Sequence, residues 1–395
     1  MKISAQFVVF MKILVWVFCF HCNVMLSKAG MVRHISSESP SPSNPPKYRN
    51  GLEKLILSIL LGVVTGLICA VLFACLVRFF RQYMNRTPIL KGPVVFSPKI
   101  EPKTLRLVLS NETVDQNHLI GSSLNGRYYK TVLDNGLTVA VKRLEPFENG
   151  SPEARSSSVK RRLQQELEML AGLGHRNLMS LRAYVREPDR ISLVYDYAPN
   201  GSLEDAMNRV RENRLLLGWE VRLRIAVGIV KGLEYLHFGC FPQILHCNLK
   251  PTNVMLDAEF EPRLADCGLG KLIPNLNRAA SGYSAPECFL SCRYTDKSDV
   301  FSFGVILGVL LTGRDPMDPF FRETASGVSL GQWLRHLQQA GEAREALDKS
   351  ILGEEGEEDE MLMAVKIAVV CLSDSSADRP SSDELVSMLT QLHSF

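Results

Sequence analysis

An uncharged, apolar segment at residues 55–77 constrains the fold of this chain more than any other feature. A helix rises about 1.5 Å per residue, so a segment of this length spans the hydrocarbon core of a bilayer, which is about 30 Å thick. The sequence therefore predicts a transmembrane helix that separates the chain into two parts.

The N-terminus carries a second apolar stretch. Residues 6–20 are mostly apolar, and small residues follow at a spacing suited to cleavage, which is typical of a signal peptide over residues 1–29. Lys12 interrupts the stretch, so an uncleaved first membrane segment is the alternative. With cleavage, residues 30–54 form a short extracellular segment and residues 78–104 a cytoplasmic juxtamembrane segment, which is single-pass type I topology.

The predicted extracellular segment is rich in serine and proline. It is too short and too polar to bury a core, so it cannot form a ligand-binding domain. We therefore expect the protein to need a partner in order to recognise an extracellular signal.

Small residues recur along one face of the predicted membrane helix. Gly62, Gly66 and Ala70 follow one another at intervals of four residues, which lets a second helix approach closely. Glycine is common in membrane helices in general, so this spacing leaves specific pairing and ordinary composition both open.

The chain after residue 105 carries a series of short motifs. In order they are Gly121-Ser-Ser-Leu-Asn-Gly126, Val-Ala140-Val-Lys142, Glu166 in a helical segment, Tyr195-Asp-Tyr197, His-Cys-Asn248-Leu-Lys250-Pro-Thr-Asn253, Asp266-Cys-Gly, Ala-Pro-Glu287, Asp299-Val-Phe-Ser-Phe-Gly and Asp-Arg379-Pro. Each motif alone is weak evidence, but the whole order resembles the protein kinases. The resemblance implies an α+β bilobal fold over residues 105–395, with the N-lobe ending near residue 197.

The resemblance also implies which groups would face a nucleotide. Lys142 would hold phosphate oxygens and form an ion pair with Glu166, while Asp266 and Asn253 would hold magnesium. The glycine loop and the lobe connection would contribute the remaining contacts, from Gly121, Gly126, Ala140, Tyr195 and Tyr197. Three further residues, Glu287, Asp299 and Arg379, would be structural, with Arg379 pairing with Glu287.

Asn248 stands where the resemblance requires an aspartate. That aspartate takes the proton from the substrate hydroxyl, and an amide cannot take it. Lys250, the other catalytic residue of the loop, is present. We therefore expect a pseudokinase; because a positioned base contributes about 10²–10⁴ in rate, a weakly active serine/threonine kinase is the alternative.

Other departures from the kinase pattern concern the nucleotide. Ser123 replaces the middle glycine of the loop, where a side chain crowds the path of the phosphates. Tyr128 replaces a small residue that would cover the adenine and could partly fill its pocket, and Cys267 replaces a packing phenylalanine. ATP and magnesium binding therefore stay open.

Several strings resemble plant receptor-like kinases in particular: His-Arg-Asn-Leu, Asn-Gly-Ser-Leu-Glu-Asp and Lys-Ser-Asp-Val-Phe-Ser-Phe-Gly. The resemblance implies a plasma-membrane pseudokinase that pairs with a leucine-rich-repeat receptor-like protein lacking a kinase, and possible further contacts with other receptor kinases. It also implies an indirect role in perception of CLE peptides and in meristem maintenance, with retention in the endoplasmic reticulum when unpartnered. A trafficking adaptor that acts through the membrane helix is a further alternative.

Composition gives no sign of other partners. The formal net charge is only +3, and no basic face points to nucleic acid. The cysteines lack the spacing of a metal site, so we expect no structural metal.

Overall fold

The computed structural model describes residues 47–84, 92–110, 119–123, 126–144, 157–186, 191–269, 282–290, 293–323, 328–353 and 357–392. The predicted signal peptide and most of the predicted extracellular segment lie outside these residues. The chain divides into two compact units, Met1–Arg86 and Thr87–Phe395.

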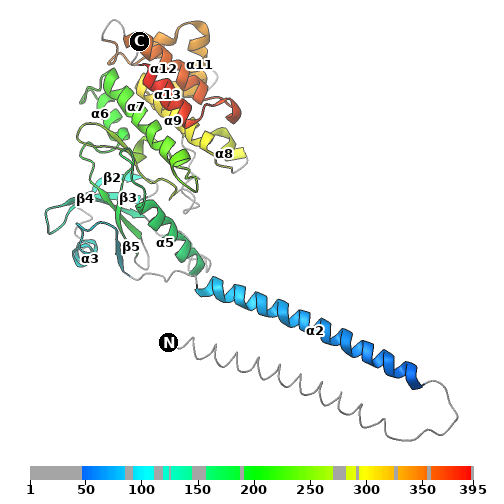
Figure 1. The fold of residues 1–395 in the computed structure, drawn as a ribbon. Helices are drawn as coiled ribbons and strands as arrows, with labels where there is room; N and C mark the ends of the chain where they lie inside the picture. The colour runs from blue at the N-terminus through cyan, green and yellow to red at the C-terminus, as the bar shows by residue number, and fades with distance from the viewer. Residues whose placement is uncertain are drawn as a thin grey trace, which may run out of the picture. The chain divides into compact units, whose positions relative to one another are not determined.

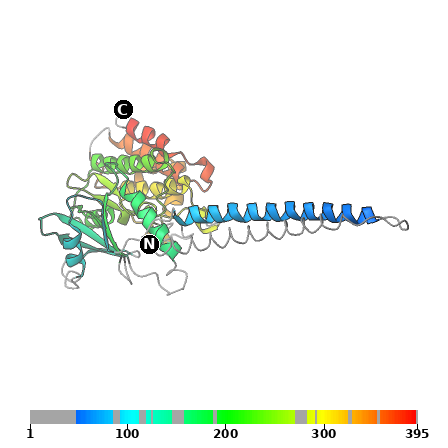
Figure 2. The same cartoon turned by 60° about the horizontal axis from the view of Figure 1, so that its bottom comes forward.

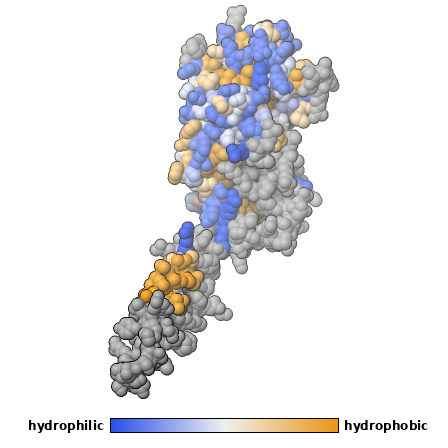
Figure 3. All heavy atoms as spheres, turned by 90° about the vertical axis from the view of Figure 1, so that its right-hand side faces the viewer, coloured by the Kyte–Doolittle hydropathy of each residue, from blue (hydrophilic) through white to orange (hydrophobic). Residues whose placement is uncertain are grey.

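The described part of the first unit is the long helix α2 (Lys47–Met84), within which Ile56–Arg78 is apolar enough to cross a membrane. The apolar side chains of this span are exposed, Leu57 by 67% and Leu67 by 62%. Figure 3 shows the hydrophobic colour gathered on this helix, as expected of a surface that lipid covers. The helix also extends past the predicted limits of 55 and 77 at both ends.

The N-lobe of the second unit is built on one sheet with the strand order β1-β5-β6-β4-β3-β2, in which every neighbouring pair is antiparallel. Its strands are β1 (Pro93–Val95), β2 (Leu119–Ser123), β3 (Gly126–Val132), β4 (Thr138–Leu144), β5 (Leu181–Arg186) and β6 (Ile191–Asp196). Gly136, at a φ of +78°, allows the tight turn between β3 and β4.

Strand β1 lies inside the segment that the sequence assigned to the juxtamembrane region. It pairs with β5, and the backbone N–H groups of Phe96 and Ser97 then donate to the carbonyl of Arg182 at 2.8 and 3.2 Å. The folded domain therefore begins before residue 105. A strand this short leaves no alternating pattern in the sequence from which its pairing could be inferred.

A helix covers each face of the sheet (Figures 1 and 2). Alternation along β4 turns Val139 and Val141 toward α3 (Pro102–Ser110), which buries Leu105 and Leu109 against them. On the opposite face, Leu144 joins the core formed with α5 (Ser157–Ala171). The same alternation places Lys142 on the α5 side of the sheet.

The C-lobe is mainly helical, with a small hairpin beside the catalytic loop. Its helices are α6 (Leu203–Arg211), α7 (Trp219–Glu234), α8 (Pro286–Leu290), α9 (Asp296–Thr312), α10 (Pro319–Glu323), α11 (Leu330–Ala340), α12 (Glu357–Cys371) and α13 (Ser382–Gln391). Short helical turns are η1 (Tyr235–Gly239), η2 (Pro251–Asn253), η4 (Ala343–Ala346) and η5 (Ser376–Asp378), and the hairpin joins β7 (Val254–Leu256) to β8 (Pro262–Leu264).

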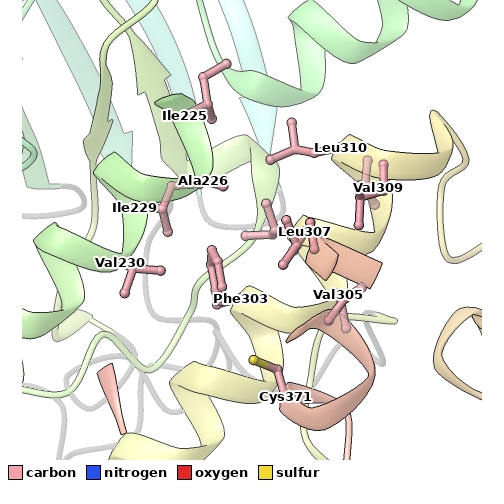
Figure 4. Close-up of a cluster of buried hydrophobic side chains, with 14 of the residues drawn as sticks. Ile225, Ala226, Ile229, Val230, Phe303, Val305, Leu307, Val309, Leu310 and Cys371 are labelled. Carbon is pink, nitrogen blue, oxygen red and sulfur yellow. The ribbon is translucent and has the colours of Figure 1, made fainter. Parts of the chain in front are cut away.

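The C-lobe core is centred on α7 and α9. Figure 4 shows Ile229 of α7 beside Phe303 and Leu307 of α9, all of them buried. Gly304 lets α12 approach closely, since a Cβ there would lie 2.6 Å from that of Cys371. This packed helical core supports the loops that carry the functional residues.

Replacing Leu105 with alanine is expected to lower the free energy of unfolding by about 2–5 kcal/mol, because a fully buried leucine leaves a cavity. Leu107 on the same helix is 66% exposed, so Leu107→Ala is the matched control and should cost less than about 0.5 kcal/mol. Urea unfolding of the full chain in detergent, followed by tryptophan fluorescence, measures both. Equal losses would contradict the packing of α3 on the sheet.

Candidate functional site

The predicted site residues converge from the sheet, the catalytic loop and the turn after β8. Lys142 comes from β4, Asn248 and Asn253 come from the loop and turn before β7, and Asp266 follows β8. The backbone joins these segments, because Ala265 N–H donates to the carbonyl of Asn253 at 2.8 Å. Residues far apart in the sequence are thus fixed beside one another.

Lys142 and Asp266 form a buried ion pair at the centre of the site. The side chains of both residues are fully buried, and the Lys142 ammonium donates to Oδ2 of Asp266. Asp266 has a φ of +63°, a left-handed conformation that is uncommon for a residue with a side chain. The turn is closed by Gly268 N–H, which donates to the carbonyl of His246 at 3.1 Å.

Tyr128 is the third side chain of this buried cluster. Its hydroxyl donates to the same Oδ2 of Asp266 at 3.2 Å, and the Lys142 ammonium lies 4.7 Å from the centre of its ring. The side chain is buried, with only 8% of the residue exposed. The tyrosine therefore fills space between the sheet and the Asp266 turn.

Burial determines the protonation of these groups. It raises the pKa of Tyr128 well above its usual value, and the charge of Asp266 raises it further. The phenol accordingly remains a neutral donor at physiological pH. Burial lowers the pKa of Lys142, whereas its pairing with Asp266 opposes that change.

The structure does not contain the ion pair predicted between Lys142 and Glu166. Among the described residues, Lys142 pairs with Asp266, and Glu166 lies half-buried on α5 without an ion pair. Two buried charges stabilise each other in a low dielectric, whereas a partly exposed carboxylate keeps much of its hydration. The lysine accordingly pairs with the buried aspartate.

The catalytic loop presents amides and one ammonium. Nδ2 of Asn253 donates to the carbonyl of Asn248 at 2.8 Å, while Nδ2 of Asn248 has no acceptor among the described residues. Burial lowers the pKa of Lys250, and repulsion from Lys142 lowers it further. The loop thus offers no carboxylate at the position of the catalytic base.

Asp299 anchors the catalytic loop through hydrogen bonds. It accepts hydrogen bonds from the backbone N–H groups of His246 and Cys247 at 2.8 and 3.0 Å, and from the Tyr294 hydroxyl at 2.8 Å. His237 Nε2 lies 3.1 Å from the same carboxylate. Burial opposes ionisation of Asp299, but the bond from His237 and nearby charges leave its pKa below the usual value.

The contributions of His237 and Tyr294 were missed in the sequence. His237 also contacts the hydroxyl of Ser382 at 3.0 Å, so it ties the loop to the start of α13. A histidine at the end of a helix has no distinctive spacing in the sequence. Only its burial beside an aspartate in the folded chain identifies its role.

Glu287 and Arg379, which were predicted to pair, form a two-pronged ion pair. Arg379 Nη1 donates to Oε1 of Glu287 at 2.7 Å and Nη2 donates to Oε2 at 2.9 Å. Such a fork fixes orientation as well as charge. The pair joins the start of α8 to the segment before α13.

The predicted adenine-side residues lie on β4 and at the end of β6. Ala140 is paired with Tyr195 in neighbouring strands, and both are buried. Tyr197 is half-buried, with the Lys130 ammonium 4.6 Å from its ring centre. Between these tyrosines, Asp196 accepts from Arg182 of β5 at 2.8 and 2.6 Å, a pair that fixes the connection between the lobes.

Both ends of the glycine loop belong to strands. Gly121 lies opposite Tyr128, and Ser123 lies opposite Gly126, in the β2–β3 pairing. The two residues between Ser123 and Gly126 lie outside the described part of the chain. This register brings the loop next to the strand that carries Tyr128.

The site meets only part of what a nucleotide with magnesium requires. Oδ1 of Asp266 and Oδ1 of Asn253 are buried oxygens without a hydrogen-bond partner among the described residues, and such oxygens suit magnesium. However, the ammonium of Lys142 is neutralised by Asp266, and the Tyr128 hydroxyl is bound to the same carboxylate. In this arrangement the residues do not fit a bound nucleotide.

Comparisons with known proteins agree with this geometry. Residues 114–389 match the protein kinase domain family. The chain is 69% identical over 366 residues to the inactive leucine-rich repeat receptor-like protein kinase CORYNE of Arabidopsis thaliana, a match that covers 92% of this chain and 90% of that protein. It is 36% identical to the leucine-rich repeat receptor-like serine/threonine/tyrosine-protein kinase SOBIR1 of the same plant, covering 76% of this chain and 49% of that one.

A solved structure shows the same fold. The pseudokinase domain of BIR2, described as an immune regulator of the RLK/Pelle family, superposes with a TM-score of 0.62 at 29% sequence identity. The match covers 80% of this chain and 93% of the BIR2 chain. The predictions of a kinase fold and of an inactive receptor-like kinase are thereby confirmed.

The Lys142–Asp266 pair makes a direct prediction for stability. Lys142→Met should lower the free energy of unfolding by about 3–5 kcal/mol, because Asp266 would remain buried without its partner. Glu166→Gln should change it by less than about 0.5 kcal/mol, and Asp266→Asn should recover part of the loss in the Lys142→Met background. Urea unfolding of the full chain compares the variants; a larger loss for Glu166→Gln would restore the pairing predicted from the sequence.

Proposed function

Because the chain belongs to the protein kinase family and is a homologue of an inactive receptor-like kinase, we propose that it is a membrane-anchored signalling co-receptor that works without catalysis. In this role the kinase-like domain is a folded docking surface, and the apolar helix holds it at the plasma membrane. A leucine-rich-repeat receptor-like protein without a kinase of its own would recognise the extracellular CLE peptide.

The observation that carries this proposal is the chemistry at Asn248. An amide has no proton affinity at neutral pH that would let it deprotonate a substrate hydroxyl. Phosphoryl transfer also relies on cations around the phosphates, and the charge of Lys142 is neutralised by Asp266. The site therefore lacks both the base and an available phosphate anchor.

The partner would bind through the membrane helix. A Cβ added at Gly62 or Gly66 would meet nothing within 4 Å, so this face of the helix has room for a second helix. The segment at residues 30–54 is too short and polar to bind a peptide by itself, which supports the need for a partner. Delivery to the plasma membrane from the endoplasmic reticulum, and a contribution to meristem maintenance, would follow from that pairing.

The membrane pairing can be tested by filling the glycine face. Gly62→Leu with Gly66→Leu should weaken association with the receptor-like partner by about 1–2 kcal/mol, a roughly fivefold to thirtyfold loss of apparent affinity. Val64→Leu is the matched control, because residue 64 lies on the other side of the helix. Resonance energy transfer between labelled proteins in a membrane measures the association; equal values for both variants would exclude this face.

Signalling is expected to be independent of phosphoryl transfer. Lys250 makes no ion pair among the described residues, so Lys250→Met should leave the domain folded while removing a charge that transfer would need. We expect this variant to restore peptide signalling as well as the wild-type chain in cells that lack it. Phosphate incorporation by the purified full chain, with and without Asn248→Asp, is measured alongside.

Two outcomes would contradict the co-receptor proposal. Transfer by the wild-type chain that disappears together with signalling in Lys250→Met would favour the weakly active kinase. Full signalling by residues 1–86 alone would favour a trafficking adaptor, because that truncated chain retains the membrane helix without the kinase-like domain.

A further inference from the structure

The geometry points to Tyr128 as the residue that decides whether this site accepts a nucleotide: its side chain is an internal latch that joins the N-lobe sheet to the Asp266 turn. The inference rests on the proposed non-catalytic function and specifies how the site is kept closed. Here "latch" means the three side chains of Tyr128, Lys142 and Asp266 together with their contacts.

The register of β3 and β4 produces the first contact of the latch, between Tyr128 and Lys142. Tyr128 of β3 and Lys142 of β4 are direct cross-strand partners, so their side chains leave the sheet on the same face. Side chains in such a pair lie about 5 Å apart at Cβ. The aromatic ring consequently lies beside the ammonium that would otherwise be available to phosphate, with 4.7 Å from the ring centre to Nζ.

The second contact crosses from one lobe to the other. The Tyr128 hydroxyl and the Lys142 ammonium both donate to Oδ2 of Asp266, which belongs to the C-lobe. All three residues are buried, with exposures of 8%, 0% and 2%. A hydrogen bond to a buried charged group is among the stronger ones that a protein makes.

The charges within the latch balance one another. Lys142 and Asp266 neutralise each other, and Tyr128 adds a donor without adding a charge. A nucleotide would bring anionic phosphates to this site, and they could reach Lys142 only if the ammonium left the carboxylate and the tyrosine ring moved aside. Such a ligand must therefore break a buried ion pair and a buried hydrogen bond before it gains its own contacts.

Tyr129 provides an internal control for this inference. It is the next residue in β3, is also buried, and points to the opposite face, where it packs in the core with Val139 and Val141. Removal of its hydroxyl makes the same chemical change one position away. Tyr129→Phe should accordingly leave the nucleotide site unaffected.

The experiment measures binding of a fluorescent ATP analogue with magnesium to the full chain in lipid nanodiscs. Tyr128→Val should bind at least about tenfold more tightly than the wild-type chain, since the competing hydrogen bond to a charged group is removed. Adding Lys142→Met to Tyr128→Val should abolish the gain. Tyr129→Phe should bind like the wild-type chain.

A second readout covers the case in which Tyr128→Val does not fold. Tyr128→Phe keeps the ring and removes only the hydroxyl. Amide hydrogen exchange should become faster at Gly268 and Leu269, whose N–H groups are hydrogen-bonded in the turn that carries Asp266. Tyr129→Phe should leave exchange at these amides unchanged.

The latch is refuted if the wild-type chain binds the nucleotide as tightly as folded Tyr128→Val does, or if the gain persists without Lys142. Unchanged exchange in Tyr128→Phe would refute it as well. Each of these results leaves the co-receptor proposal standing, because that proposal is tested by signalling. Conversely, loss of signalling in Lys250→Met would refute the co-receptor proposal without affecting the latch.

Discussion

The buried ion pair between Lys142 and Asp266 is the interaction on which the rest of the site depends. It joins β4 of the N-lobe to the turn after β8 of the C-lobe, and both side chains are excluded from water. Ions in such a place are stable only when each compensates the other. The positions of Tyr128, Asn253 and Lys250 around the pair then follow from the strands and loops that present it.

A second set of buried polar contacts keeps this arrangement rigid. Asp299 binds the catalytic loop through two backbone N–H groups, and His237 and Tyr294 bind the same carboxylate. Glu287 and Arg379 connect the start of α8 to the segment before α13. A chain without a catalytic base thus retains a domain that is held together by buried polar contacts.

The sequence predicted the elements whose chemistry is carried by local motifs. The apolar run at 55–77, the order of the kinase motifs and the Glu287–Arg379 pair could all be identified, because each depends on residue type and spacing. The pairing of β1 with β5 could not be predicted, because a strand of three residues gives no periodic signal. The sequence wrongly predicted Glu166 as the ion-pair partner of Lys142. The order of the motifs along the chain gives no information about where α5 lies relative to the lysine in the folded domain.

The same ion pair explains why the motif lysine and aspartate are not, in this chain, evidence of catalysis. Removing either charge would leave the other buried without compensation, so both contribute to folding whether or not phosphate is ever bound. Asn248 has no such constraint: its Nδ2 lies without an acceptor among the described residues, and no buried cation depends on it. A base can be lost at that position without loss of the fold, whereas loss of Lys142 or Asp266 alone would destabilise the kinase-like domain.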